Sequence, residues 1–286
     1  MKRWIIALIS VLMFAAILIC GTGVFTSCND NSDNPVPAKK KYRLVQRKDV
    51  VEETGVYYIT DYSYDDQGRL ASFVRYVHKP QLGDGTYVEG KITYTYGDHY
   101  ILEDHHNNFY YYYTLNDDGL IVKAQSYTIE DGVETPGYPD YLQYKDGRIL
   151  SVEDTNAKHL TVFHYEGDDL MYFQREDVEV SPFLNTYTRT DLSVDHGYLN
   201  TPYTTMDEPL YMMGYFGKPS KHLESHKKSE TKDSKTYVLF DYDYTYTIAD
   251  GHIVEMVEVT HMIIDYVFYK DDSTKTTTST FTYEEY

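Results

Sequence analysis

One pattern constrains the fold of this chain more than any other: short, alternating or Tyr-rich runs separated by Asp/Gly or Asn/Asp clusters. Five stretches repeat it: "YSYDDQGRLASF" from Tyr62, "YYTLNDDGLIVKA", "LQYKDGRILSV", "VFHYEGDDLMYF" and "YTIADGHIVEM". In most of them an Asp or Asn side chain can bond nearby backbone, and the Gly that follows accepts a positive φ at low cost. The Leu or Ile after the Gly then starts a return strand. The pattern therefore predicts consecutive β-hairpins.

The hairpin pattern predicts strands over most of the chain after residue 55. We expect them at 56–64, 69–78, 87–96, 109–115, 120–129, 140–145, 148–154, 159–165, 169–175, 236–248, 252–269 and 274–285. Because the connections are short, successive strands should be antiparallel. The predicted fold is all-β, a single antiparallel meander that forms a curved sheet or barrel of about twelve strands. Residues 181–234 lack a period of two and should form an irregular or short-helical insertion.

The N-terminus has the layout of a secretory signal. Lys2 and Arg3 precede an apolar run over residues 4–19, and small residues follow in "GTGVFTSC". This segment resembles a bacterial lipoprotein signal, which is cut before a cysteine that becomes lipid-modified. The resemblance implies a signal peptide at 1–27, lipidation at Cys28, a lipidated cysteine and flexible tether at 28–41, and a single β domain at 42–286. The alternatives are an ordinary cleaved signal and an uncleaved anchor helix.

The residues after Cys28 and the overall charge bear on location and partners. The acidic, Asn-rich start of "NDNSDNPVPAKKK" resembles the export signal of Bacteroidota lipoproteins. We therefore expect an outer membrane lipoprotein, held to the membrane by its N-terminal lipid and facing the periplasm or the cell surface, with the surface favoured. The chain has 45 acidic and 26 basic residues, for a net charge of −19. Nucleic-acid binding requires a basic surface, so no nucleic-acid partner is expected.

A second segment carries a family resemblance. "PLYMMGYFGKPSKHL", which follows several hairpins and a lipoprotein signal, resembles an uncharacterised Bacteroidota lipoprotein family with a porin-like antiparallel β fold. The stretch "YDDQGRL" also loosely resembles the tyrosine-aspartate repeats of Rhs-type shells. These resemblances imply a fold and a location, and they supply no catalytic residues.

A porin-like fold raises the question of whether the strands cross the membrane. A membrane-spanning strand needs about ten residues with a continuous apolar face. The most apolar candidate is "HIVEMVEVTHMIIDYVFY". Glu255 and Asp265 interrupt one of its faces, and Glu258 interrupts the other. We therefore expect the sheet or barrel to lie outside the bilayer.

Sequence motifs for catalysis and for metal binding are largely missing. The chain has no GxSxG, HExxH or Gly-rich phosphate loop, and its two cysteines belong to the signal and the lipid site. "HLESH" would place His222 and His226 one helical turn apart, as in a chelate, but lysines surround it. "LEDHHNN" contains the four consecutive residues Glu103 to His106. On a strand, adjacent residues among these four would point to opposite faces, which disfavours a shared metal site. We expect no catalytic residue, no metal and no cofactor.

Tyrosine is the strongest candidate for ligand binding, with 33 residues against 11 phenylalanines. In "FYYYYTL", Tyr110 and Tyr112 share one strand face, and "DYDYTYTI" places Tyr242, Tyr244 and Tyr246 on one face. Either set could stack on a sugar ring or a peptide. The simpler alternative is a cross-strand ladder that stabilises the sheet.

Two functional classes remain open. The first is a non-catalytic cell-envelope lipoprotein that binds extracellular glycan or protein through a Tyr-rich face. The second is a structural envelope component without a small ligand. A glycan-directed hydrolase is third, because any two of the 45 acids can converge in the fold. An exposed aromatic cluster would favour binding, whereas a barrel packed with its own side chains would favour the structural role.

Overall fold

The structure is a computed structural model that describes residues 42–286, except for 84, 176–182, 189–207, 233–235 and 267–268. The predicted signal at 1–27, the tether at 28–41 and the lipidation site Cys28 lie outside the described residues.

The described residues form sixteen strands, one short helix and one 3-10 turn at Pro80–Leu82. The first eight strands are β1 (Tyr42–Val51), β2 (Val56–Tyr64), β3 (Leu70–His78), β4 (Thr86–Tyr96), β5 (Tyr100–Asp104), β6 (Phe109–Leu115), β7 (Ile121–Glu130) and β8 (Val133–Lys145). The others are β9 (Arg148–Asp154), β10 (His159–Glu166), β11 (Asp169–Arg175), β12 (Phe183–Thr188), β13 (Leu223–Lys232), β14 (Thr236–Ala249), β15 (His252–Tyr266) and β16 (Tyr269–Glu285). The helix is α2 (Glu208–Met212).

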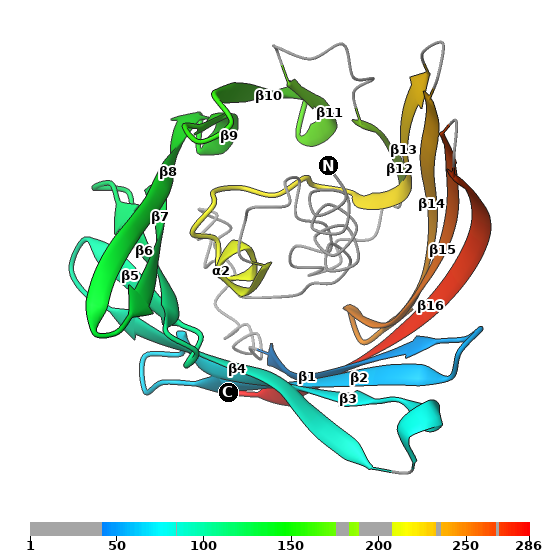
Figure 1. The fold of residues 1–286 in the computed structure, drawn as a ribbon, viewed down its shortest axis with the longest axis horizontal. Coiled ribbons are helices and arrows are strands. Elements are labelled where there is room, and N and C mark those ends of the chain that lie inside the picture. Colours follow the sequence, from blue (N-terminus) through cyan, green and yellow to red (C-terminus); the bar gives the residue numbers. More distant parts are fainter. Residues whose placement is uncertain (1–41, 84, 176–182, 189–207, 233–235, 267–268) are drawn as a thin grey trace, which may run out of the picture.

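The strands form one closed antiparallel barrel. Each strand pairs with its sequence neighbours, and β1 pairs with β16 from Tyr42 opposite Glu285 to Val51 opposite Thr277. Among the described residues the pairing is thinnest between β11 and β12, where two residue pairs align. Figure 1 looks along the barrel and shows the ring of strands with α2 inside it. The prediction of an all-β antiparallel meander is confirmed.

The strand number exceeds the predicted twelve because β1, β5, β12 and β13 were not predicted. Two of these, β12 and β13, lie within 181–234, which was expected to be irregular; only its α2 matches the expected short helix. The sequence of β13, "LESHKKSETK", is polar on both faces, so it shows no alternation of apolar and polar residues. Pairing with β14 over seven residues stabilises β13 as a strand, although its sequence pattern does not predict one.

The five repeated stretches all lie at the same end of the barrel. In an up-and-down barrel every second connection is at the same end, and the repeats form the connections β2–β3, β6–β7, β8–β9, β10–β11 and β14–β15. We call this end the Asp/Gly rim and the opposite end the distal rim. At β8–β9, Asp146 and Gly147 both have positive φ, of 55° and 76°, as a two-residue type I′ turn requires. The period seen in the sequence is therefore the interval between turns on one rim.

The apolar face of the barrel points inward. Buried residues from most strands meet there, among them Leu44, Leu70, Ile101, Ile149, Phe163 and Ile253. Outward positions near the middle of strands carry charges: Lys48, Asp61, Lys91, Asp241 and Asp243. A membrane-spanning barrel has the reverse arrangement, with a continuous apolar band outside.

Candidate functional site

A chain segment between β12 and β13 fills one end of the barrel. Residues 208–222, which we call the plug, begin with α2 inside the ring of strands (Figure 1). Leu210, Met212 and Phe216 are almost fully buried and belong to the same core as the barrel strands. The backbone N–H of Ile121, at the start of β7, donates to the carbonyl of Tyr215 at 2.9 Å. The plug therefore packs at the Asp/Gly rim.

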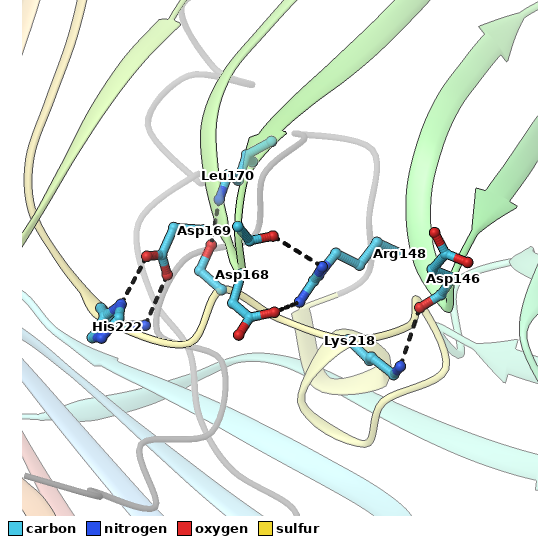
Figure 2. Close-up of polar contacts among 9 residues, drawn as sticks. Asp146, Arg148, Asp168, Asp169, Leu170, Lys218 and His222 are labelled. Carbon is cyan, nitrogen blue, oxygen red and sulfur yellow. Dashed lines mark hydrogen bonds and ion pairs between the residues drawn. The ribbon is translucent and has the colours of Figure 1, made fainter.

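A set of polar contacts, which we call the clasp, ties the plug to two turns of that rim (Figure 2). The Lys218 backbone N–H donates to the Gly147 carbonyl at 2.7 Å, and its Nζ donates to the Asp146 carbonyl at 3.1 Å. His222 contacts Asp169 twice, through its backbone N–H at 3.0 Å and through Nδ1 at 2.7 Å. The plug is thus held by backbone and charged groups as well as by apolar packing.

The turns of the clasp are also tied to each other. Arg148 pairs with Asp168 (Figure 2). It also donates to the Gly167 carbonyl at 3.2 Å. The hydrogen bond from the Arg148 guanidinium to the Asp168 carboxylate, together with the guanidinium charge, lowers the pKa of Asp168. Both groups lie near solvent, so each pair adds little stability, and the clasp mainly fixes the position of the plug.

The two histidines of "HLESH" do not form the helical chelate that their spacing allowed. His222 belongs to the clasp, whereas His226 lies in β13 and faces outward between Asp241 at 3.4 Å and Asp243 at 2.9 Å. Across the described part of the chain, no group of three or more His, Cys, Asp and Glu residues is arranged to hold a metal.

The side chains of "LEDHHNN" separate as expected for a strand. Glu103 is buried on the inner face, where it accepts from His105 Nε2 at 2.5 Å and from the Tyr113 hydroxyl at 2.8 Å. Asp104 and His106 face outward and contact each other, with 3.5 Å between the side-chain Nδ1 and Oδ2. The four residues therefore make two separate pairs.

The predicted tyrosines of β14 lie inside the barrel. Tyr244 is buried, Tyr242 stacks on it at 6.5 Å between ring centroids, and the Tyr246 hydroxyl donates to the Glu224 carbonyl at 2.6 Å. Burial raises the pKa of both Tyr242 and Tyr244. These three residues are part of the interior packing and do not belong to the outer surface.

The predicted tyrosines of β6 lie on the outer face, in a patch that spans four strands. The register aligns three rows across β5, β6, β7 and β8. The rows are Asp104–Tyr110–Tyr127–Pro136, Leu102–Tyr112–Gln125–Pro139 and Tyr100–Thr114–Lys123–Tyr141. We call the five tyrosines of these rows the outer tyrosine wall. Tyr112 and Tyr141 are its most exposed members, at 37% and 43%.

Stacking holds the rings of the wall in place. Tyr110 lies on Tyr127 at 4.8 Å between ring centroids with an interplanar angle of 6°, and Tyr112 lies on Tyr100 at 5.2 Å and 15°. The Tyr110 hydroxyl donates to Glu134 at 2.5 Å. Burial and this hydrogen bond raise the pKa of Tyr110 to about 12. The wall is a preformed aromatic surface with charges at its margins.

Two interior carboxylate pairs were not identified from the sequence. Glu224 and Glu258 are buried behind β13–β15, and burial raises the pKa of Glu224 to about 7 and also raises that of Glu258. Asp140 and Asp154 lie opposite each other on β8 and β9. Burial, followed by the charge of Asp154, raises the pKa of Asp140 to about 6. Glu224 and Glu258 are far apart in the sequence, and a bulge in the β8–β9 pairing sets Asp154 opposite Asp140. No local sequence motif therefore marks either pair.

The barrel is similar to solved structures described as porin-like proteins from Bacteroides. One, from Bacteroides uniformis, has a TM-score of 0.61 and 18% sequence identity, and the match covers 84% of this chain and 96% of that chain. Another, from Bacteroides vulgatus, has a TM-score of 0.50 and 12% identity, with coverage of 84% and 98%. At these identities the likeness shows the fold alone: a porin-like antiparallel β architecture.

Other comparisons add no family. No family model matches the chain, and the search of curated proteins gives no match. No helix in the described residues is long and apolar enough to cross a membrane.

Proposed function

We propose that this protein is a lipid-anchored, non-catalytic component of the cell envelope that binds an extended extracellular glycan through its outer tyrosine wall. The observation that carries the proposal is the alignment of five outward tyrosines in three rows over β5–β8. Aromatic rings present apolar faces that stack on sugar rings, while their hydroxyls remain available to water or to ligand hydroxyls.

The composition of the wall supports a glycan ligand. Its rows contain mainly Tyr, Leu, Pro, Thr and Gln, with one acid, Asp104, and one base, Lys123. On β14, by contrast, the outward positions are acidic at Asp241 and Asp243. The rows thus carry one charge of each sign and no net charge on an otherwise strongly acidic protein, which suits a neutral polymer better than an anionic one.

The envelope location rests on two observations. The N-terminus resembles a lipoprotein signal with Cys28 as the acceptor. The barrel is similar to porin-like proteins from Bacteroides, yet its outward mid-strand positions include Lys48, Asp61 and Asp241. Charges there disfavour contact with hydrocarbon. The proposal therefore places the barrel outside the bilayer, tethered by lipid at the outer membrane and facing the cell surface.

The structural role remains the second candidate, because the plug and inward side chains fill the Asp/Gly end of the barrel. A barrel packed in this way needs no ligand in its interior. The two candidate functions differ in what they require of the outer surface of the barrel. Only glycan binding requires the outer tyrosine wall to remain accessible.

Affinity electrophoresis of the full-length protein in detergent, through gels containing soluble neutral polysaccharides, tests the proposal. We expect at least one polysaccharide to retard the wild type and Tyr112→Ala and Tyr141→Ala to weaken binding about 5-fold each, which corresponds to loss of roughly 1 kcal/mol of ring stacking. Circular dichroism checks that the variants are folded.

Tyr172→Ala is the matched control. Tyr172 is also an outward strand tyrosine in a stack, against His164 at 4.2 Å, but it lies on β11 outside the wall. This variant should bind like the wild type. If no polysaccharide retards the wild type, or if Tyr172→Ala loses as much affinity as Tyr112→Ala, the binding role fails and the structural role is favoured.

A further inference from the structure

Two acidic residues face each other inside the barrel, toward the distal rim. Asp140 of β8 lies directly opposite Asp154 of β9. Both are on the inner face, because the next inward pair is Leu142 and Val152, which belong to the core. Directly opposed residues on antiparallel strands have Cβ atoms about 4.5–5.5 Å apart, so their carboxyl groups are neighbours.

This arrangement is unfavourable as it stands. Like charges directly opposite each other destabilise a sheet. Asp154 Oδ1 accepts the backbone N–H of Ala157 at 2.9 Å. Asp140 is half-buried, and within the described residues it neither accepts a hydrogen bond nor pairs with a cation. The charge pair therefore lacks a counter-charge.

A third oxygen on the same face also lacks a partner. Thr161 of β10 is fully buried, and its hydroxyl has no hydrogen-bond partner in the described structure. It pairs with Val152, so it lies on the inner face and diagonally next to Asp154, which faces His159. A buried hydroxyl without a protein partner is available to an ion or a water.

We propose that Asp140 and Asp154 bind a divalent cation, Ca²⁺, inside the barrel, with the Thr161 hydroxyl next to the site. Ca²⁺ takes six to eight oxygen ligands in flexible geometry, and carboxylates, hydroxyls and water all serve. Two carboxylates neutralise its charge, and water can complete the coordination because Asp140 is only half-buried. With few protein ligands the affinity should be in the range of extracellular calcium modules, about 0.1–1 mM.

The neighbouring charged groups are compatible with this site. Arg175 of β11 faces Thr161, one row nearer the Asp/Gly rim, and His159 faces Asp154. Burial and Asp154 alone account for the raised pKa of Asp140. Neither Arg175 nor His159 therefore acts as the cation for Asp140, and the position between the two carboxylates is suited to a metal.

Thermal unfolding of the full-length protein in detergent at pH 8, in EDTA or in CaCl₂, tests the site. For a dissociation constant of about 1 mM, about 10 mM CaCl₂ should raise the Tm of the wild type by roughly 3 °C. Asp140→Asn and Asp154→Asn should remove this rise. In EDTA, Asp140→Asn should melt at or above the wild-type temperature, because the repulsion between the two carboxylates is gone.

Asp243→Asn is the matched control, since it removes one acid of the outward Asp241 and Asp243 pair beside His226. It should keep the full response to CaCl₂. Isothermal titration with CaCl₂ should give one site in the wild type and in the control. The proposal is overturned if CaCl₂ acts no differently from NaCl at equal ionic strength, or if Asp140→Asn retains the wild-type response.

Discussion

Glu224 and Asp49 are both buried carboxylates on the inner face of the barrel, but of the two only Asp49 is hydrogen-bonded to a cation. Asp49 Oδ1 accepts from Arg47 Nε at 2.6 Å and from the Ser279 hydroxyl at 2.6 Å, which joins β1 to β16 at the closure of the barrel. Neither oxygen of Glu224 has a hydrogen-bond partner in the described structure. Burial of an unpaired carboxylate favours its neutral form, and burial raises the pKa of Glu224.

Glu224 should make stability depend on pH. Burial raises its pKa from 4.5 to about 7; Glu258 adds to this rise, whereas Lys227 and His226 oppose it. Between these pH values the folded state holds a proton that the unfolded state has lost. The free energy of unfolding therefore falls as pH rises from about 4.5 to 7, by up to about 3 kcal/mol. Glu224→Gln should reduce this fall, as measured by urea unfolding at pH 5 and pH 8.

Two further expectations, one for the residual pH dependence of the free energy of unfolding and one for a control variant, make the test specific to Glu224. Glu258, whose pKa is also raised, still contributes in the variant, so the slope should shrink without vanishing. Glu230→Gln changes an outward residue of the same strand, which pairs with Lys228 at 3.4 Å, and it should keep the wild-type slope. An unchanged slope in Glu224→Gln would refute the assignment.

At the scale of single residues, the sequence predicts which side chains share a strand face, but it does not predict which face points into the barrel. Alternation placed Tyr110 with Tyr112, and Tyr242 with Tyr244, as the register confirms. The first pair is outside and the second inside. For β14 a signal was available, because Asp241 and Asp243 alternate with its tyrosines and charged residues prefer the outside. For β6 both faces are aromatic, so only the closed barrel decides.

At the scale of elements, hairpins with regular alternation were predictable and polar or irregular strands were not. The ranges 56–64, 109–115, 148–154 and 169–175 agree with β2, β6, β9 and β11. Strand β1 was missed because buried Arg47 and Asp49 interrupt its apolar face. The sequence did not predict that Asp140 lies opposite Asp154, because a bulge between Gln143 and Tyr144 shifts the strand register expected from the β8–β9 turn by one residue.

The plug offers a test at the scale of elements. Gly217 has φ of +90°, and a Cβ there would overlap the carbonyl oxygen of Gly147 on the rim. Gly217→Ala should therefore strain the backbone and also push the plug away from the β8–β9 turn. We expect a loss of about 3 kcal/mol in the free energy of unfolding and faster proteolytic cleavage within 208–222.

Gly119→Ala separates the two effects of that substitution. Gly119 also has a positive φ, of +78°, but no atom lies within 4 Å of a Cβ built on it. It should lose only about 1 kcal/mol, the cost of the backbone conformation, and leave proteolysis of the plug unchanged. Equal losses in the two variants would mean that the contact between plug and rim contributes nothing.

At the scale of the whole molecule, the two ends of the barrel differ. The described chain enters β1 and leaves β16 at the Asp/Gly rim, where the Arg43 guanidinium lies over the Tyr286 ring at 5.1 Å and Gly68 borders the same ring. The plug and clasp are at this end too. If Cys28 carries lipid, a tether of residues 29–41 would hold this rim on the order of 20 Å from the membrane. The distal rim would then point away from it.

The proposed function attributes membrane attachment to a lipid on Cys28 and not to the strands. Outward charges such as Lys48, Asp61 and Asp243 disfavour insertion of the barrel. Cys28→Ala should therefore move the protein from the membrane fraction to the soluble fraction, while Cys20→Ala, which changes the other cysteine of the chain, should leave it in the membrane. Two or more acyl chains anchor almost irreversibly, so the wild type should resist a carbonate wash. If Cys28→Ala also resists that wash, its mass distinguishes an uncleaved signal helix from a barrel that inserts despite its charges.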